Sequence, residues 1–387
     1  MRFPEFSGEW NKYTINDLAT VVGGGTPDTT VKSYWGGDIQ WFTPSEIGKN
    51  KYVDFSKRTI TRDGLDNSSA KLLPLHTILL SSRATVGECS IASNECTTNQ
   101  GFQSLIAKQC NIDFLYYLIQ TKKKDLIRNA CGSTFLEISA NEIRKIKVAV
   151  PVQNEQEQIA KLLSLIDERI ATQNKIIEDL KKLKSAISKY LFARKDLLET
   201  TICLSNIATL KNGYAFQSGK YNALGKWKIL TITNVPGERY INDEDCNCII
   251  NLPNDIQDHQ VLKEGDILIS LTGNVGRVSL CKNGNYLLNQ RVGLLQLSKN
   301  VNREFLYQIL SSQRFENSMI ACGQGAAQMN IGKGDVENYV LPYSSNGNNI
   351  LFAAKILHSY DECIINELRR LTLLTMQKQY LLTQMFI

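Results

Sequence analysis

Apolar residues follow a helical repeat in two long segments of the chain. In the first, from Glu155 to Phe192, no glycine or proline interrupts the sequence, and apolar residues recur at alternating spacings of three and four. These are the spacings of the inner positions of a coiled coil, so the pattern predicts two long helices with an apolar seam. The seam positions are Ile159, Leu163, Ile166, Ile170, Ile177, Leu180 and Ile187 in the first segment, and Ile364, Leu371, Leu374 and Leu381 in the second.

Polar residues interrupt both seams at corresponding places. Such residues fix the register and the partner of a helix at some cost in stability. One interpretation is that each helix packs only on its own globular domain, but the repeated interruptions favour packing of the two helices on each other. A helix of this length spans about 57 Å at 1.5 Å per residue, which suits a molecular ruler. The corresponding residues are Asp167 and Asp361, Gln173 and Glu367, and Lys184 and Lys378.

The segments outside these helices form a tandem repeat with a period of about 190 residues. Short apolar runs rich in β-branched residues predict strands in both copies, and amphipathic spacing predicts a helix in each. The strands are expected at 39–42, 77–81, 102–107 and 147–150, and again at 229–233, 266–270, 293–297 and 339–341; the helices are expected at 114–128 and 303–320.

These patterns together predict an α+β fold with a pseudo-twofold internal repeat. Two tandem mixed α/β domains are joined by two long helices, which form an antiparallel coiled-coil spacer. The expected boundaries are 1–154 for the first domain, 155–195 for the central helix, 196–345 for the second domain and 346–387 for the C-terminal helix.

Composition and charge narrow the function only slightly. The formal net charge of +6 suits a polyanionic partner, but many enzymes share it. No apolar run of membrane-spanning length and no signal-peptide pattern is seen, so a cytoplasmic protein without membrane contact is expected. The ten cysteines are scattered, which is typical of reduced thiols. Cys246 and Cys248 lack the second ligand pair of a zinc site, so no metal is expected.

A search for catalytic motifs finds none. The Pro-Pro-aromatic motif of amino-methyltransferases is absent because the sequence contains no adjacent prolines. The Gly23–Gly25 run leads into Thr26 and Pro27, which cannot start a phosphate-binding helix, and no Walker lysine follows a Gly-x4-Gly step. The three histidines have no metal-ligand spacing, and His358 is expected on a helix surface near the seam. A duplicated protein without catalytic motifs is more typical of a binding module than of an enzyme.

Several motifs resemble the specificity subunits of type I restriction-modification systems. They include the N-terminal Arg2-Phe3-Pro4-Glu5-Phe6, Gly24-Gly25-Thr26-Pro27, Tyr34 to Trp41, Ser82 to Gly87, Thr98 to Phe102, and the start of the long helix with Pro151, Glu155, Gln156 and Asp167. The resemblance covers essentially the whole chain and is most specific in the first half. In the second half, Gln100-Gly101-Phe102 becomes Gln290-Arg291-Val292, a divergence expected of two domains that read different bases.

The resemblance implies two target-recognition domains, each reading one half of a bipartite double-stranded DNA site. It implies no catalysis by this chain, which would serve as a scaffold for two methyltransferase subunits and for restriction (translocase) subunits. S-adenosylmethionine, ATP and Mg²⁺ would belong to those partners, and this chain would hold no cofactor. The alternatives are the specificity subunit of a related type II-like complex, a fused enzyme with its own catalytic domain, and a non-DNA coiled-coil scaffold.

The polar residues of the repeated turns are the candidate DNA contacts. Arginine can form bidentate bonds with guanine, and asparagine or glutamine with adenine. A competing interpretation is that the repeated Asn99 and Asn289 only brace their turns. For the basic loop around Lys49, a solvated surface is an equally good interpretation. The full candidate set is Arg83, Thr85, Asn99, Gln100, Lys49, Lys51, Lys57 and Arg58 in the first domain, and Thr272, Asn274, Arg277, Asn289, Gln290 and Arg291 in the second.

Overall fold

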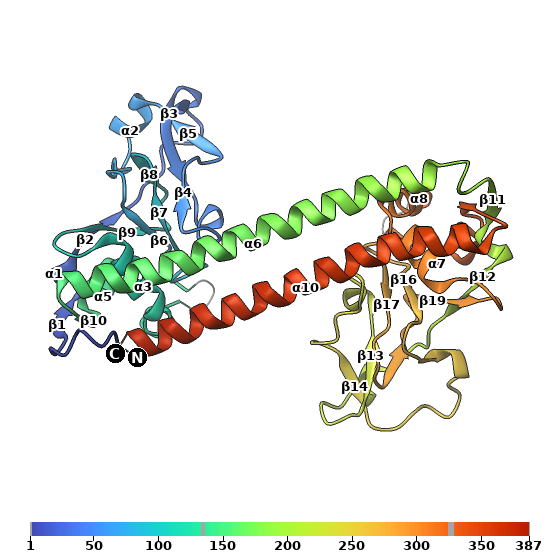
Figure 1. Ribbon diagram of the computed structural model, residues 1–387. Helices are drawn as coiled ribbons and strands as arrows, with labels where there is room; N and C mark the ends of the chain where they lie inside the picture. Colours follow the sequence, from blue (N-terminus) through green and yellow to red (C-terminus); the bar gives the residue numbers. More distant parts are fainter. Residues whose placement is uncertain (1, 133–135, 324–328, 387) are drawn as a thin grey trace. The chain divides into compact units, whose positions relative to one another are not determined.

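The protein consists of two compact units, each built around its own core. The computed structural model describes residues 2–132, 136–323 and 329–386. Unit 1 comprises Met1–Asn174 and Arg370–Ile387, and unit 2 comprises Lys175–Arg369 (Figure 1). Each unit therefore contains part of both long helices, α6 (Gln153–Ala193) and α10 (Gly347–Met385).

Unit 1 contains three sheets and five short α-helices besides its parts of α6 and α10, within the residues described. The sheets have the orders β1-β10, β2-β9-β6-β7-β4 and β5-β3-β8. The elements are β1 (Asn11–Thr14), α1 (Ile15–Leu18), β2 (Ala19–Gly23), η1 (Lys32–Tyr34), β3 (Trp35–Phe42), η2 (Pro44–Glu46), β4 (Tyr52–Val53), β5 (Arg58–Ile60), α2 (Arg62–Asp66), β6 (Ile78–Leu80), β7 (Cys89–Ala92), β8 (Cys96–Thr98), β9 (Gln103–Ala107), α3 (Ile112–Thr121), α4 (Lys123–Arg128), α5 (Ala140–Lys145) and β10 (Lys147–Val150).

Unit 2 repeats this arrangement. Its sheets have the orders β11-β20, β12-β19-β16-β17 and β14-β13-β18-β15. The elements are β11 (Thr200–Cys203), η3 (Leu204–Asn206), β12 (Ala208–Asn212), η4 (Ser218–Lys220), β13 (Trp227–Leu230), η5 (Ile232–Asn234), β14 (Asn247–Ile249), η6 (Asp258–Gln260), β15 (Val261–Leu262), β16 (Ile267–Ser270), β17 (Val278–Leu280), β18 (Tyr286–Leu288), β19 (Val292–Leu297), α7 (Arg303–Leu310), α8 (Gln313–Cys322), α9 (Lys333–Glu337) and β20 (Val340–Tyr343).

Alternating side chains let the central sheet of each unit pack on both faces. In β6, Ile78 and Leu80 join the core formed with α3 and α6, whereas Leu79 joins a separate cluster with Phe42 of β3. Successive residues of a strand point to opposite faces, so one short apolar run supplies two cores. In β16, Ile267 and Ile269 face the helices and Leu268 the other side in the same way.

The helix that covers the sheet is capped identically in the two units. The side chain of Asn111 accepts a hydrogen bond from the Phe114 amide at the start of α3, and Asn302 accepts one from Phe305 at the start of α7. An asparagine cap satisfies an amide that has no partner within the helix. Phe114 and Phe305 are then fully buried at the equivalent position of each core.

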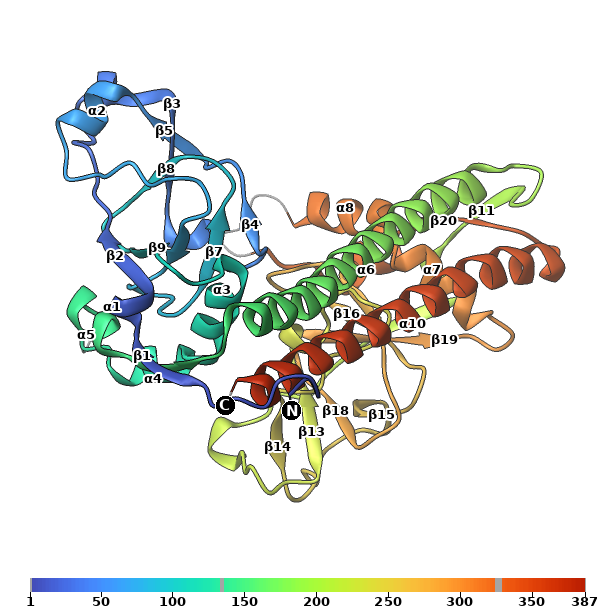
Figure 2. The ribbon, with the colours of Figure 1, turned by 60° about the vertical axis from the view of Figure 1, so that its left-hand side comes forward.

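In each unit, α6 and α10 run antiparallel and contribute to the same core. In unit 1, Ile159 and Leu163 of α6 share a cluster with Leu381 and Met385 of α10. In unit 2 the shared cluster contains Leu191 of α6 with Ala353 and Leu357 of α10. Figures 1 and 2 show the two helices side by side within each unit. All the predicted seam residues are buried or half-buried, so the helices pack on each other and on the globular part of each unit.

Most of the predicted strands and helices are confirmed, with two corrections. The helix expected at 114–128 is divided into α3 and α4 at Lys122, and the one expected at 303–320 into α7 and α8, where Ser312 caps α8. The strand expected at 229–233 ends at Leu230, because the Asn234 side chain accepts hydrogen bonds from the backbone and hydroxyl of Thr231 and closes a 3₁₀ turn.

The described residues contain neither a metal-binding cluster nor a membrane-spanning helix. No group of three or more His, Cys, Asp or Glu side chains in residues 2–132, 136–323 and 329–386 is arranged to hold a metal ion. Over the same residues, none of the helices has the length and apolar character that would be needed to cross a membrane.

Candidate nucleic-acid interface

Three turns of unit 1 meet near the ends of β2, β6 and β8. They follow β2 (Gly24–Thr26), connect β6 to β7 (Ser82–Gly87) and follow β8 (Asn99–Gly101). Backbone hydrogen bonds join them: the Ser82 amide donates to the Gly101 carbonyl at 2.8 Å and the Gly25 amide to the Thr98 carbonyl at 2.8 Å. We call these three turns the turn cluster of unit 1.

Unit 2 contains an equivalent turn cluster. It comprises Gly213 and Tyr214 after β12, Leu271–Gly276 between β16 and β17, and Asn289–Arg291 after β18. The Leu271 amide donates to the Arg291 carbonyl at 3.1 Å, and the Gln290 amide to Tyr214 at 3.0 Å. The duplication seen in the sequence therefore extends to the polar turns.

Glycines of the clusters serve the packing inside each unit. A Cβ on Gly24 or Gly213 would overlap the Asn99 or Asn289 carbonyl, so only glycine fits there. Gly87 has φ +88°, and a Cβ on it would lie 2.8 Å from Lys123 of α4; Gly276 of unit 2 approaches α8 equally closely. The glycine of this turn thus allows the backbone to approach a helix of the same unit closely.

The repeated asparagines brace their turns. The Asn99 side chain accepts a hydrogen bond from the Gly101 amide at 2.9 Å, and Asn289 accepts one from Arg291 at 3.3 Å. Both asparagines are half-buried, whereas the adjoining Gln100 and Gln290 are exposed. Gln100 accepts a hydrogen bond from the Thr26 hydroxyl of the neighbouring turn. The bracing interpretation therefore describes the asparagines, and the exposed glutamines are better suited to meet a ligand.

The exposed face of the unit 1 cluster carries Arg83 and Thr85. The Arg83 guanidinium donates to the Glu137 carboxylate at 2.8 and 3.0 Å, and both side chains are nearly half exposed. Ion pairs this exposed contribute between 0 and about 1 kcal/mol, so Arg83 can exchange Glu137 for another anion at small cost. The Thr85 hydroxyl lies 2.9 Å from that of Ser81.

The exposed face of the unit 2 cluster has different chemistry. Asn274, Gln290 and Arg291 are exposed, and Thr272 is half-buried in a β-bridge with Asn330. Arg277 lies 3.4 Å from Glu316 of α8. Its counterpart in unit 1 is Glu88, which pairs with Lys123 of α4. The turn thus carries the positive member of this pair in unit 2 and the negative member in unit 1.

The basic residues of the 49–58 loop fall into three environments. Lys49 and Lys57 are exposed. Arg58 stacks on Trp35 with its guanidinium carbon 3.6 Å from the ring centroid, and Trp35 meets the buried Trp41 edge to face. The Lys51 ammonium instead faces the interior of unit 1: it is 10% exposed and lies 2.7 Å from the Asp113 carboxylate. Because this ammonium is already paired with Asp113, Lys51 is less suited to contact a DNA phosphate than the exposed Lys49 and Lys57.

Sequence reasoning missed the polar contacts between the two long helices. Lys378 of α10 lies 2.7 Å from Asp167 of α6 in unit 1, and Lys184 of α6 lies 2.6 Å from Asp361 of α10 in unit 2. The sequence shows the four residues as two repeated pairs, but it does not show that they are partners across the helices. Antiparallel packing of two equivalent helices brings each aspartate to the lysine of the other helix. The repeated Asp and Lys positions, combined with antiparallel packing, could therefore have predicted these pairs.

The comparisons with known proteins agree with the duplication. A family model described as type I restriction modification DNA specificity domain matches residues 7–182 and 199–375. The chain is 38% identical over 192 residues to the MjaIX specificity subunit of Methanocaldococcus jannaschii, covering 48% of this chain and 44% of that protein. It is 28% identical over 206 residues to the EcoR124I/EcoR124II specificity subunit of Escherichia coli, covering 51% and 50%. The chain thus spans about half the length of these curated relatives.

Solved structures share the fold along the whole chain. The S subunit of a type I restriction-modification system from M. genitalium superposes with a TM-score of 0.58 at 18% identity, covering 100% of this chain and 99% of that one. A chain from a structure concerning assembly and conformational transition of the type I R-M system gives a TM-score of 0.60 at 13% identity, with 98% of both chains covered.

Proposed function

The chain belongs to the family of type I restriction modification DNA specificity domains, two copies of which follow each other in its sequence, and from this premise we propose that it recognises a bipartite double-stranded DNA target. Each unit reads one half-site through its turn cluster. The chain carries out no reaction itself. It directs methyltransferase and restriction subunits to the DNA they act on.

One observation carries the proposal: the same turn cluster occurs twice, with the bracing asparagines kept and part of the exposed surface changed. Asn99 and Asn289 hold their turns in the same way. In contrast, Gly101 after Gln100 becomes Arg291 after Gln290. Constant scaffolding with variable exposed donors and acceptors is the arrangement expected of two readers of different base sequences.

The exposed side chains of the clusters have the chemistry of base-edge and phosphate recognition. Arg83 and Arg291 can donate two parallel hydrogen bonds to guanine, and Gln100, Asn274 and Gln290 can do the same for adenine. The exposed lysines and Arg58 suit phosphates, which position a protein on DNA without reading sequence. The proposed DNA contacts are Arg83, Thr85, Gln100, Lys49, Lys57 and Arg58 in unit 1, and Thr272, Asn274, Arg277, Gln290 and Arg291 in unit 2.

The methyltransferase subunits are proposed to dock on the long helices, which expose large apolar side chains. In unit 2, Ile176, Leu183 and Tyr190 of α6 recur every seven residues and are 41%, 47% and 64% exposed. In unit 1, Leu373 and Met376 of α10 are 65% and 62% exposed. S-adenosylmethionine, ATP and Mg²⁺ are assigned to the partner subunits. Two methyltransferase subunits, one for each unit, would match the duplication.

Methylation mapping tests the proposal directly. The chain is expressed with its methyltransferase subunit in a host without other adenine methylation, and modified adenines are located genome-wide. Two short specific blocks separated by a non-specific spacer are expected. The variant Arg291→Ala should relax one block, while the exposed control Arg314→Ala, outside the turn cluster, should leave both blocks unchanged. A single uninterrupted motif, or methylation by the purified chain alone, would contradict the proposal.

A further inference from the structure

A buried polar network joins four elements of unit 1. The Lys51 ammonium, from the loop before β4, contacts Asp113 of α3 at 2.7 Å and donates to the Ser164 hydroxyl of α6 at 2.6 Å. One turn further along α3, the Tyr117 hydroxyl donates to Asp167 of α6 at 2.7 Å. Lys378 of α10 completes the network by pairing with Asp167. A loop of the globular part is thereby fastened to both long helices.

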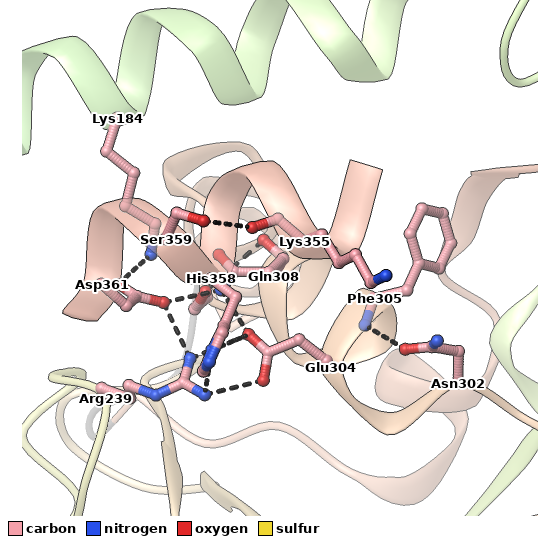
Figure 3. A network of polar contacts seen from close by, with 11 residues as sticks. Lys184, Arg239, Asn302, Glu304, Phe305, Gln308, Lys355, His358, Ser359 and Asp361 are labelled. Atoms are coloured by element: carbon pink, nitrogen blue, oxygen red, sulfur yellow. Dashed lines mark hydrogen bonds and ion pairs between the residues drawn. The ribbon is translucent and has the colours of Figure 1, made fainter. Parts of the chain in front are cut away.

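Unit 2 contains the same network with different residues (Figure 3). Arg239, from the loop before Tyr240, donates to both oxygens of Glu304 of α7 at 2.8 and 2.7 Å, and lies 2.9 Å from His358 of α10. Gln308, one turn further along α7, donates to Asp361 of α10 at 2.6 Å. Lys184 of α6 pairs with Asp361 from the opposite helix.

The two networks correspond residue by residue. Six positions are filled twice, and the chemistry of each position is kept: a cation in the loop, a carboxylate in the first turn of the covering helix, a donor in its second turn, a polar residue and an aspartate on one long helix, and a lysine on the other. The pairs are Lys51 and Arg239, Asp113 and Glu304, Tyr117 and Gln308, Ser164 and His358, Asp167 and Asp361, and Lys378 and Lys184.

Burial of the charged groups restricts the geometry of these contacts. The side chains of Lys51 and Arg239 are 10% and 8% exposed, and that of Asp361 is 8% exposed. Burial alone would raise the pKa of Glu304, but the hydrogen bonds from Arg239 and Gln308 outweigh it and lower that pKa. A buried charge must keep its partners, because leaving it unpaired is costly. A shift of the loop on the helices would therefore separate these buried charges from their partners.

The network connects to the turn cluster through one strand pairing. In unit 1, Tyr52 next to Lys51 pairs with Ile91 of β7, and β7 begins just after the turn that carries Arg83. In unit 2, Tyr240 next to Arg239 forms a bridge with Leu280 of β17, the strand after the turn that carries Asn274. A shift of the loop on the helices would thus move the reading turns.

We propose that Lys51 and Arg239 are positioning residues, which lock the turn cluster of each unit onto its pair of long helices and thereby determine the spacer length that the DNA target must have. The inference rests on the proposed function, because it concerns how the two half-sites are read together. Half-site sequence is set by the exposed turn residues. Spacer tolerance is set by the buried locks.

The test compares spacer tolerance in the assembled methyltransferase complex. Targets with the native spacer and with one base pair more or less are methylated by the wild-type complex and by variants. In K51M/D113N, which removes both charges of the Lys51–Asp113 pair, the preference for the native spacer should fall roughly tenfold, the equivalent of about one charged hydrogen bond. The preferred bases of both half-sites should not change. R239M should act likewise.

Exchanged residues and a surface control separate positioning from stability. Lys51→Arg and Arg239→Lys install the cation that the other unit uses, and should retain at least half of the wild-type spacer preference. Lys71→Met removes an exposed lysine of unit 1 and should retain all of it. Unchanged spacer preference in both K51M/D113N and R239M would overturn the proposal, as would altered half-site bases.

A second measurement does not depend on DNA. Hydrogen exchange in the purified full chain should be faster at the amides of residues 48–53 and 160–168 in K51M/D113N than in the wild type, and unchanged in Lys71→Met. If the wild type methylates no bipartite motif but this exchange difference appears, the proposed function fails while the lock itself is retained. If exchange in 48–53 and 160–168 is unchanged, the lock is disproved whatever the DNA target is.

Discussion

At the residue scale, neighbouring polar side chains of one turn have different tasks. Asn289 is half-buried and binds the Arg291 amide, whereas Gln290 beside it is exposed. In this turn the asparagine thus stabilises the fold, and the exposed glutamine is available to contact a ligand. The distinction could not be read from the sequence, where both residues recur in the two halves.

Substitution of these neighbours should give opposite phenotypes. Asn289→Ala removes a side-chain to backbone hydrogen bond and should lower the free energy of unfolding by about 1 kcal/mol. Gln290→Ala should change it by less than about 0.5 kcal/mol, as is usual for an exposed position. Only Gln290→Ala should selectively weaken recognition of one half-site while the protein remains fully folded. Urea unfolding and methylation mapping of both variants check this, and equal effects of the two on stability would contradict it.

The acid sensitivity of unit 2 should depend on Glu199. Hydrogen bonds from its own amide and from Ser344 and Ser345 lower the pKa of Glu199 from 4.5 to about 2. Because the folded pKa is the lower one, the stability that this carboxylate provides is complete above pH 4.5 and is lost as the pH falls toward 2. Urea unfolding of wild type and Glu199→Gln between pH 6 and pH 2.5 should show a shallower acid decline in the variant. Parallel curves would rule out this contribution.

At the element scale, the two long helices were the most predictable part of the protein. The polar contacts between them were the least predictable. The repeated apolar spacing, with no glycine or proline between Glu155 and Phe192, was sufficient to predict α6 and α10. The seam alone did not reveal that Asp167 pairs with Lys378, since pairing depends on which residues meet in antiparallel register. The break at Lys122 was equally hidden, because the sequence around it contains no glycine or proline that would end a helix.

Lengthening both helices together should lengthen the spacer of the proposed target. Seven residues inserted between Asn174 and Lys175, and seven between Arg369 and Arg370, leave every contact within a unit intact. They add roughly 10 Å to each helix, or about three base pairs of DNA. Methylation mapping should show both half-sites unchanged and a spacer longer by about three base pairs.

The control is the same insertion in α6 alone. It makes one helix longer than its partner, so the Lys184–Asp361 and Lys378–Asp167 pairs cannot both form. Methylation should then be strongly reduced. An active double insertion with the original spacer would show that these helices do not set the distance.

At the scale of the whole molecule, the duplication could be predicted because anchors such as Asn99 and Asn289 keep a nearly constant offset along the chain. The set of residues that belongs to each unit could not be predicted, because it depends on which unit the end of α10 packs against. Leu381 and Met385 complete the core of unit 1, although more than two hundred residues separate them from Asn174, where the first segment of that unit ends. Because α10 begins in unit 2 and ends in unit 1, the boundaries of the two units differ from the boundaries of the two sequence repeats.

Loss of one buried side chain near the end of α10 should therefore weaken unit 1 selectively. Leu381 is 8% exposed and belongs to the unit 1 core, so Leu381→Ala should lower the free energy of unfolding of that unit by about 2–5 kcal/mol. Leu373→Ala, at a position of the same helix that is 65% exposed, is the matched control and should cost less than about 0.5 kcal/mol. Hydrogen exchange should accelerate in β6, β9 and α3 and remain unchanged in β16, β19 and α7.

The division of unit 1 into two segments also has a consequence for biosynthesis. Domains usually fold in the order in which they leave the ribosome, the N-terminal one first. Here unit 2 is one continuous stretch that ends at Arg369, so it is complete while unit 1 still lacks its last helical turns. Until Leu381, Met385 and Phe386 emerge, Phe114 and Leu163 of the nascent unit 1 have no cover from α10. The unit translated first thus finishes folding last, and in that interval part of its apolar core has no cover from α10.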